Sequence, residues 1–233
     1  GMFRADQMGV YIHWPFCAAK CPYCDFNSHV REKIDQAVWA DAYVKALSHY
    51  AEILPDQQVV SIFFGGGTPS LMHPETVERI IDAIQSSWRV ANDIEITLEA
   101  NPTSVEIEKF QGFRVAGVNR ISLGVQAMNN DDLKFFGREH SVDEALKAID
   151  IARTCFERYS FDLIYARPKQ TLKAWEEELL EAERPKLIAQ ASAEKVPRSR
   201  EWITRVDELV IAFVLGIQKH KPTETRQETG EQK

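Results

Sequence analysis

The sequence has no hydrophobic run that could cross a membrane and no excess of positive charge. Its longest apolar run, residues 209–217, is far shorter than the roughly 20 residues that a spanning helix needs. The 28 lysines and arginines are outnumbered by 35 aspartates and glutamates, which gives a net charge of −7 and disfavours binding to nucleic-acid phosphates. A charged N-terminal segment followed by an apolar stretch and a cleavage site is also missing, so export is not expected. We therefore expect a soluble, cytoplasmic protein that binds no nucleic acid and has no transmembrane segment.

Cysteine is scarce, and this scarcity excludes a disulfide-based scaffold. The chain has 4 cysteines, three of which are Cys17, Cys21 and Cys24. In a reducing compartment such clustering indicates a metal site or catalysis rather than disulfide bonds. The fourth, Cys155, stands in an apolar helical pattern and is expected to pack in the core.

Short apolar runs alternate with longer helical patterns along most of the chain. Strands are expected at residues 10–14, 59–64, 94–98, 120–125 and 161–165, and the run 59–64 is apolar enough to be buried on both faces. Helices are expected at about 34–53, from Pro74 onward, at about 105–115, over most of 131–156, and at 172–182. This alternation predicts an α/β fold with a parallel sheet, whose sites lie at the carboxyl ends of the strands.

The pattern changes after residue 183. Residues 185–200 are polar, residues 201–220 look helical, and residues 221–233 contain no apolar side chain. No sixth strand is evident in this segment. We expect a core domain at residues 1–183 and a divergent tail at 184–233 that is partly helical and partly disordered.

The spacing CxxxCxxC curls a loop so that three thiolates can converge on one point. Three thiolates leave one iron of a [4Fe-4S] cluster open, and that iron can chelate the amino and carboxylate groups of S-adenosylmethionine. The alternative is a structural zinc site completed by His13 or His29. Spacing alone leaves both open, but a loop that follows the first strand of an α/β domain is a common active-site position and favours the cluster.

Several motifs share the order and spacing of one known family. They are YIHWPFC at 11–17, CPYCDFN at 21–27, GGGTPS at 65–70, LEANP at 98–102, SLGVQ at 122–126, FGREH at 136–140 and FDLIY at 161–165. Together they resemble the HemN/HemW branch of the radical-SAM proteins, most closely its heme chaperones, over residues 9 to about 180. The resemblance implies a partial (βα)6 TIM-like barrel that here lacks its last strand.

The resemblance also implies a set of site residues. Cys17, Cys21 and Cys24 would hold the [4Fe-4S] cluster, and S-adenosylmethionine would contact Tyr11, Tyr23, Gly66, Gly67, Thr68, Glu99, Gln126, Arg138 and Asp162. From the residues alone, alternatives stay open. The glycine run reads equally well as a plain strand-to-helix turn, since no Gly-Lys-Ser/Thr follows it. Glu99 stands at the end of an apolar strand. It is either a buried carboxylate, which needs a cationic partner, or an ordinary surface carboxylate. Arg138 could bind a carboxylate or be a solvated helix arginine.

Two functions from different classes compete. One is a heme chaperone that delivers heme to an acceptor hemoprotein; the other is oxygen-independent coproporphyrinogen III dehydrogenase, an enzyme of porphyrin biosynthesis. The dehydrogenase pattern has a further cysteine two positions after the third, where this chain has Phe26, so the chaperone is favoured. The C-terminal His-Asn-x-x-Tyr-Trp segment that the family links to heme binding is absent. We therefore expect a shortened variant and keep a third alternative, a remnant that has no activity or holds a structural zinc ion.

Overall fold

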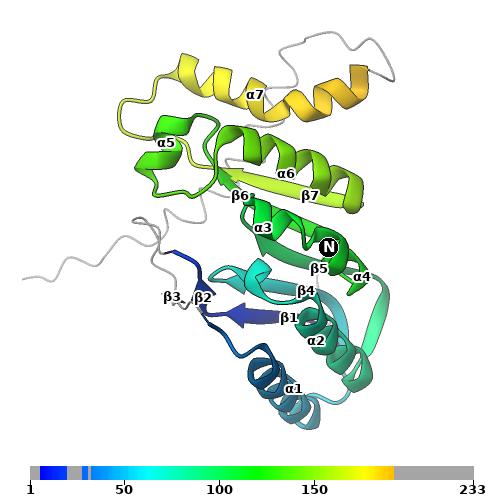
Figure 1. The fold of residues 1–233 in the computed structure, drawn as a ribbon. Helices are drawn as coiled ribbons and strands as arrows, with labels where there is room; N and C mark the ends of the chain where they lie inside the picture. Colours follow the sequence, from blue (N-terminus) through cyan, green and yellow to red (C-terminus); the bar gives the residue numbers. More distant parts are fainter. Residues whose placement is uncertain (1–5, 20–27, 31–32, 192–233) are drawn as a thin grey trace, which may run out of the picture. The chain divides into compact units, whose positions relative to one another are not determined.

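The computed structural model describes residues 6–19, 28–30 and 33–191, without the side chains of 183–191. The chain divides into two compact units, Gly1–Lys186 and Leu187–Lys233, and the first of them contains the sheet (Figure 1). Within the described residues, no helix combines the length and hydrophobicity that a membrane span requires.

Five parallel strands form the main sheet. They are β1 (Gln7–Trp14), β4 (Gln58–Gly66), β5 (Arg89–Ala100), β6 (Arg120–Gln126) and β7 (Arg158–Leu163), and they pair in the order β1-β4-β5-β6-β7. Each strand therefore lies next to the one that follows it through a helical crossover, as in a (βα) barrel that has not closed. This confirms the expected α/β class and parallel sheet.

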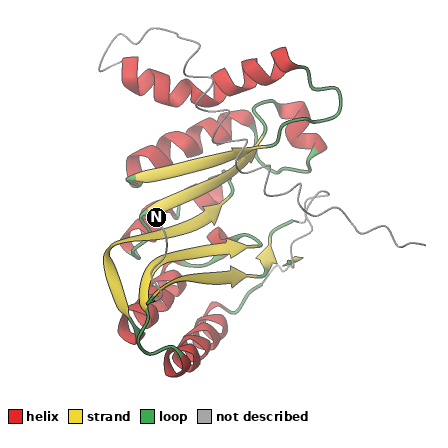
Figure 2. Cartoon of the chain, turned by 180° about the vertical axis from the view of Figure 1, so that it is seen from behind, coloured by secondary structure: helices red, strands yellow, loops and turns green. Residues whose placement is uncertain are grey.

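The helices cover one face of this sheet. Figures 1 and 2 view the sheet from opposite sides, and α2 (Pro74–Ser87), α4 (Phe110–Val115) and α6 (Val142–Cys155) lie on the same side of it. The buried side chains of these helices and of alternate strand positions form one continuous core. In α2 the apolar side chains of Val77, Ile80, Ile81 and Ile84 are all buried, and Pro74 occupies the first turn.

The opposite face of the sheet is polar. In β6 the residues Ile121, Leu123 and Val125 are buried, whereas the residues between them are Arg120, Ser122, Gly124 and Gln126. Because strand side chains alternate between faces, this second row points away from the helices. The expectation that residues 59–64 are buried on both faces is accordingly wrong. Ser61 and Phe63 of β4 are only half-buried, since their face lines the open side of the sheet.

An aromatic cluster attaches α1 (Gln36–Ile53) to the first strand. Trp14 is fully buried, and its ring centroid lies 6.0 Å from Trp39 and 6.5 Å from Tyr43. Leu47 is buried on the same helix. The Tyr43 hydroxyl donates to the His13 carbonyl oxygen at 2.5 Å. These contacts show that the aromatic side chains of α1 pack against the first strand.

Several boundaries differ from those expected. Residues 105–115 form two short helices, α3 (Ser104–Ile107) and α4, and residues 131–156 form α5 (Asn130–Phe135) and α6. The second break has a clear cause, because Gly137 at φ +65° ends one helix and the Ser141–Glu144 capping box begins the next. The helix α7 (Leu172–Ala191) continues past residue 182. The short 3₁₀ helix η1 (Pro69–Leu71) and the pair β2 (Phe16–Cys17) and β3 (His29–Val30) were not predicted.

Most of the predicted tail lies outside the residues that the structure describes. Residues 192–233 lie outside the described ranges, so the helix at 201–220, the disorder at 221–233 and the divergent tail domain stay predictions.

Shortening a core side chain should lower the free energy of unfolding more when that side chain is more deeply buried. Ile80→Ala removes a side chain that is 0% exposed, and we expect it to lower the free energy of unfolding by about 2–5 kcal/mol in urea denaturation. Ile53→Ala makes the same chemical change at a side chain that is 57% exposed and serves as the control. Equal losses in both variants would contradict the assignment of this core.

Candidate functional site

The site predicted from sequence lies along the carboxyl ends of the strands. Trp14 at the end of β1 pairs with Gly66 at the end of β4, and Glu99 near the end of β5 pairs with Ser122 of β6. Gln126 is the last residue of β6, and Asp162 stands one residue before the end of β7. Parallel strands bring these residues, which are distant in sequence, to the same edge of the sheet.

The glycine turn after β4 packs tightly against the strand that leads to the first cysteine. A Cβ on Gly66, whose φ is +111°, would lie 2.6 Å from His13 Nδ1 and 2.9 Å from the Trp14 carbonyl oxygen. A Cβ on Gly67 would lie 2.5 Å from the carbonyl oxygen of Phe16. The backbone N–H groups of Gly67 and Thr68 donate to the carbonyl oxygens of Trp14 and Phe16 at 2.6 and 2.7 Å. Only glycine fits here, and the turn fixes the backbone next to Cys17.

Glu99 is a half-buried carboxylate on the polar face of the sheet. Burial, aided by the negative charge of Asp162 and opposed by a hydrogen bond from the Gly66 backbone N–H, raises the pKa of Glu99 to about 7. No lysine or arginine of the described residues forms an ion pair with this carboxylate. A carboxylate in this setting favours a cationic ligand, because a positive charge would offset the desolvation.

Asp162 adds a second carboxylate to this part of the site. Burial raises its pKa, and the positive charge of Arg120 opposes that effect. The Arg120 guanidinium is itself held by Thr97 at 3.3 Å and Ser160 at 2.8 Å. Two carboxylates with raised pKa values therefore lie at one sheet edge, where they can accept hydrogen bonds from a bound ligand.

Three polar side chains meet above Gly124. A Cβ on this glycine would lie 3.0 Å from Gln126 Nε2 and 3.4 Å from both Arg138 Nη2 and Asn101 Oδ1. The Arg138 guanidinium donates to the Asn101 side-chain oxygen and, at 2.7 Å, to the Gly124 carbonyl oxygen. Arg138 is thus not a solvated helix arginine, because Gly137 ends α5 and places it in the following loop. The structure thus brings together Gln126 and Arg138, two of the residues named from the resemblance.

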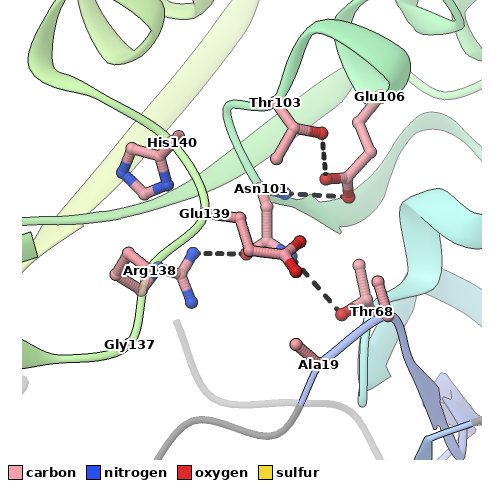
Figure 3. A pocket seen from close by; sticks show the side chains of 10 residues that line it. Ala19, Thr68, Asn101, Thr103, Glu106, Gly137, Arg138, Glu139 and His140 are labelled. Carbon is pink, nitrogen blue, oxygen red and sulfur yellow. Dashed lines mark hydrogen bonds between the residues drawn. The ribbon is translucent and has the colours of Figure 1, made fainter. Parts of the chain in front are cut away.

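A small pocket of about 30 Å³ opens beside this group (Figure 3). Ala18 and Ala19, which follow Cys17, line it together with Thr68, Asn101, Thr103, Glu106 and residues 137–140. The Asn101 amide donates to the Thr68 hydroxyl at 3.4 Å. The pocket therefore joins the start of the cysteine loop, the glycine turn and the Arg138 loop.

Glu106 holds one wall of the pocket in place. Its carboxylate is buried and accepts hydrogen bonds from the hydroxyls of Ser70 and Thr103 and from the Asn101 backbone N–H. Burial raises the pKa of Glu106, and these hydrogen bonds oppose the increase. Because all its bonds are internal, Glu106 fixes the loop after β5 rather than facing a ligand.

Tyr11 lies on the polar face of the sheet. Its side chain is 57% exposed, stacks on Phe63 with ring centroids 6.1 Å apart, and has its hydroxyl 3.3 Å from His13 Nδ1. Burial and the nearby charge of Glu99 raise its pKa. An accessible aromatic ring close to Glu99 is consistent with the predicted ligand contact.

The structure describes only part of the predicted metal site. Cys17 is buried and has a free thiol, whereas Cys21, Tyr23 and Cys24 lie outside the described residues. In the described part of the chain, no three His, Cys, Asp or Glu side chains are grouped to hold a metal ion. His29 is exposed, and Cys155 is half-buried against the core.

Sequence reasoning assigned no role to Asn101, Glu106 or His140. Asn101 and His140 stand within motifs quoted above, which was a usable signal. Glu106 follows Thr103 by three residues, the spacing of a helix cap, and that spacing says nothing about a site.

The described residues of the site carry charges of both signs. The carboxylates of Glu99 and Asp162 can bind a cation, and the Arg138 guanidinium can bind an anion. This combination suits a zwitterionic ligand.

The chain is similar to known proteins over most of its length. The model of the Radical SAM superfamily matches residues 11–182. The chain is 35% identical over 76% of its length to "Radical S-adenosyl methionine domain-containing protein 1, mitochondrial" of Danio rerio, covering 40% of that protein. It is 38% identical over 78% of its length to "Heme chaperone HemW" of Haemophilus influenzae, covering 49% of it.

The chain is also similar to a protein of solved structure. Coproporphyrinogen III oxidase (HemN) from Escherichia coli, described as a radical SAM enzyme, superimposes with a TM-score of 0.65 at 29% sequence identity. The match covers 76% of this chain and 41% of HemN. The chain thus spans less than half the length of each of these three proteins.

The steric role of Gly66 can be tested against another glycine. Gly66→Ala should lower the free energy of unfolding by about 1–3 kcal/mol more than Gly117→Ala does, as measured by urea denaturation. Both glycines have φ +111°, but a Cβ on Gly117 would come no closer than 3.5 Å to Ile81. Similar losses in both variants would show that the close packing against Trp14 is unimportant.

The raised pKa of Glu99 predicts a pH-dependent loss of stability in the ligand-free protein. Between pH 4.5 and about 7 the carboxyl ionises in the unfolded chain but keeps its proton in the folded one, so its contribution to stability falls as pH rises. Glu99→Gln cannot ionise and should gain on the order of 2 kcal/mol relative to the parent between pH 5 and pH 8. Urea denaturation at both pH values measures this difference.

The control for Glu99→Gln is Glu139→Gln, which makes the same change at an exposed carboxylate. A pH-independent difference between Glu99→Gln and the parent would contradict the assigned environment of Glu99.

Proposed function

The chain belongs to the radical SAM superfamily, and from this premise we propose that it binds a [4Fe-4S] cluster and S-adenosylmethionine and acts on heme as a HemW-like chaperone. The cluster ligands would be Cys17, Cys21 and Cys24. The cluster and S-adenosylmethionine together supply one-electron chemistry, and the protein supplies their placement.

The observation that carries the ligand part of the proposal is the environment of Glu99. This carboxylate is half-buried, lacks a cationic partner among the described residues and accepts a hydrogen bond from Gly66. The ammonium group of S-adenosylmethionine would supply such a cation. Its binding would hold Glu99 ionised at neutral pH, since an adjacent positive charge lowers a carboxyl pKa.

The remaining residues suit the other parts of the same molecule. The Arg138 guanidinium, next to Gln126 and Asn101, would bind the ligand carboxylate. Asp162 would accept hydrogen bonds from ribose hydroxyls, and the exposed ring of Tyr11 would contact the ligand from β1. Gly66, Gly67 and Thr68 would bring the turn after β4 close to the methionine end, next to the start of the cysteine loop.

Two facts support heme handling over coproporphyrinogen III dehydrogenation. Relatives named as heme chaperones are 37% and 38% identical to the chain, whereas the dehydrogenase-related HemN is 29% identical. Phe26 also stands where the dehydrogenase pattern has a cysteine. The HemN structure keeps the dehydrogenase as the second candidate. Delivery of heme to an acceptor hemoprotein, in the cytoplasm, belongs to the same proposal.

Oxygen-free reconstitution with iron and sulfide tests the cluster. The parent chain should turn brown, with about four iron and four sulfide per chain by chemical analysis, which is the content of one such cluster. Cys17→Ala should lose most of this iron, whereas Cys155→Ala should keep it, because Cys155 packs against the core. A colourless parent protein that retains zinc instead would overturn the proposal.

Titration of the reconstituted chain with heme then separates the candidate functions. A shifted Soret band that saturates near one heme per chain supports the chaperone. Conversion of coproporphyrinogen III in the presence of dithionite and S-adenosylmethionine supports the dehydrogenase. If neither result is obtained, the heme part of the proposal fails for this chain, while cluster and S-adenosylmethionine binding stand on their own measurements.

A further inference from the structure

His140 is a buried histidine that the proposed function does not use. Its side chain is 4% exposed, and it lies in the loop between α5 and α6, two residues after Arg138. Figure 3 shows the ring at the wall of the pocket, above Arg138. Burial and the positive charge of Arg138 lower its pKa to about 4, so the imidazole is neutral at physiological pH.

The hydrogen bond of His140 fixes its tautomer. Nε2 lies 2.9 Å from the carbonyl oxygen of Val125, and a carbonyl only accepts, so Nε2 carries the proton and donates. The other nitrogen, Nδ1, is buried and has no partner among the described residues. A side chain that only filled this space would be cheaper if it were apolar, since an unsatisfied buried nitrogen is costly. The presence of a histidine here is therefore best explained by the hydrogen bond that it donates to the Val125 carbonyl oxygen.

The residue after that carbonyl is conformationally unusual. Gln126 has φ +73°, a left-handed conformation that residues other than glycine rarely adopt. Its main chain is held on both sides. His140 binds the carbonyl oxygen just before it, and the Ile164 backbone N–H donates to the Gln126 carbonyl oxygen at 2.9 Å. A strained residue persists only where its neighbours fix it.

The Gln126 side chain belongs to the polar group above Gly124. The Gln126 side-chain nitrogen lies over that glycine together with the Arg138 guanidinium. The Arg138 guanidinium donates to the Gly124 carbonyl oxygen at 2.7 Å, so Arg138 and His140 bind two successive carbonyl groups of β6. The loop 138–140 is thereby fastened to the end of the strand.

We propose that His140 is a positioning residue, which holds the Val125 carbonyl and so keeps Gln126 in the left-handed conformation that directs its side chain toward the ligand beside Arg138. The proposal rests on the proposed function in one respect, because the ligand is taken to be S-adenosylmethionine. His140 itself touches no reacting atom.

The test compares three variants of the reconstituted chain by equilibrium dialysis with S-adenosylmethionine. His140→Leu removes the donor, and we expect the dissociation constant to rise about 5- to 20-fold, the effect of losing one buried hydrogen bond. His140→Gln offers an N–H at a similar reach and should stay within about 2-fold of the parent. Ile80→Ala, which is destabilised at a buried site in α2, should also stay within about 2-fold.

A double-mutant cycle then tests the route of the effect. In a Gln126→Ala background, His140→Leu should cause no further loss of affinity, because the residue through which it acts is gone. Additive losses would overturn the proposal, as would an unchanged affinity in His140→Leu or an equal loss in Ile80→Ala.

Hydrogen exchange in the ligand-free chain provides a readout that does not depend on binding. The amides of residues 124–128 should exchange faster in His140→Leu than in the parent and in His140→Gln. If the parent binds no S-adenosylmethionine, the proposed function fails while the exchange data still decide the positioning role. If exchange is equal in all three proteins, the positioning role is wrong whatever the ligand.

Discussion

One constraint organises the described structure: the parallel sheet buries one face against helices and leaves the other face polar. Ile121, Leu123 and Val125 of β6 pack into the core, while Arg120, Ser122 and Gln126 lie on the opposite side. Because side chains alternate along a strand, the apolar half of the pattern stabilises the fold and the polar half is left for a site. The same strands therefore supply both stability and chemistry.

On the polar face, two carboxyl groups lie in surroundings that disfavour their ionised form when no ligand is bound. Glu99 and Asp162 both have raised pKa values, and the guanidinium of Arg120 is shared among Thr97, Ser160 and a distant Glu95. Such groups reduce the stability of the ligand-free protein, and a ligand of complementary charge recovers that free energy. The glycine turn and the Arg138 loop contribute in a different way, because they place backbone and side chains at fixed positions with internal hydrogen bonds.

Much of the fold and part of the site could be predicted from the chain. All five strands of the main sheet were predicted, as was a helix that begins at Pro74. Gln126 and Arg138 were both named as site residues, and the structure brings them together above Gly124. The break between α5 and α6 was missed, although Gly137 and the Ser141 capping box mark it. The roles of Glu106 and His140 were missed because their partners, Ser70 and Val125, are distant in sequence or lie in another element.

The sequence by itself determined the order of strands and helices, the cysteine spacing and the family, since these depend on periodicity and on motifs that are contiguous along the chain. Only the tertiary structure decided that Glu99 forms no ion pair with a lysine or arginine of the described residues, that Gly66 must be glycine and that Gln126 is held in a left-handed conformation. Each of these depends on atoms from another strand or loop. Burial, charge and close packing are properties of neighbours in space, which no local pattern encodes.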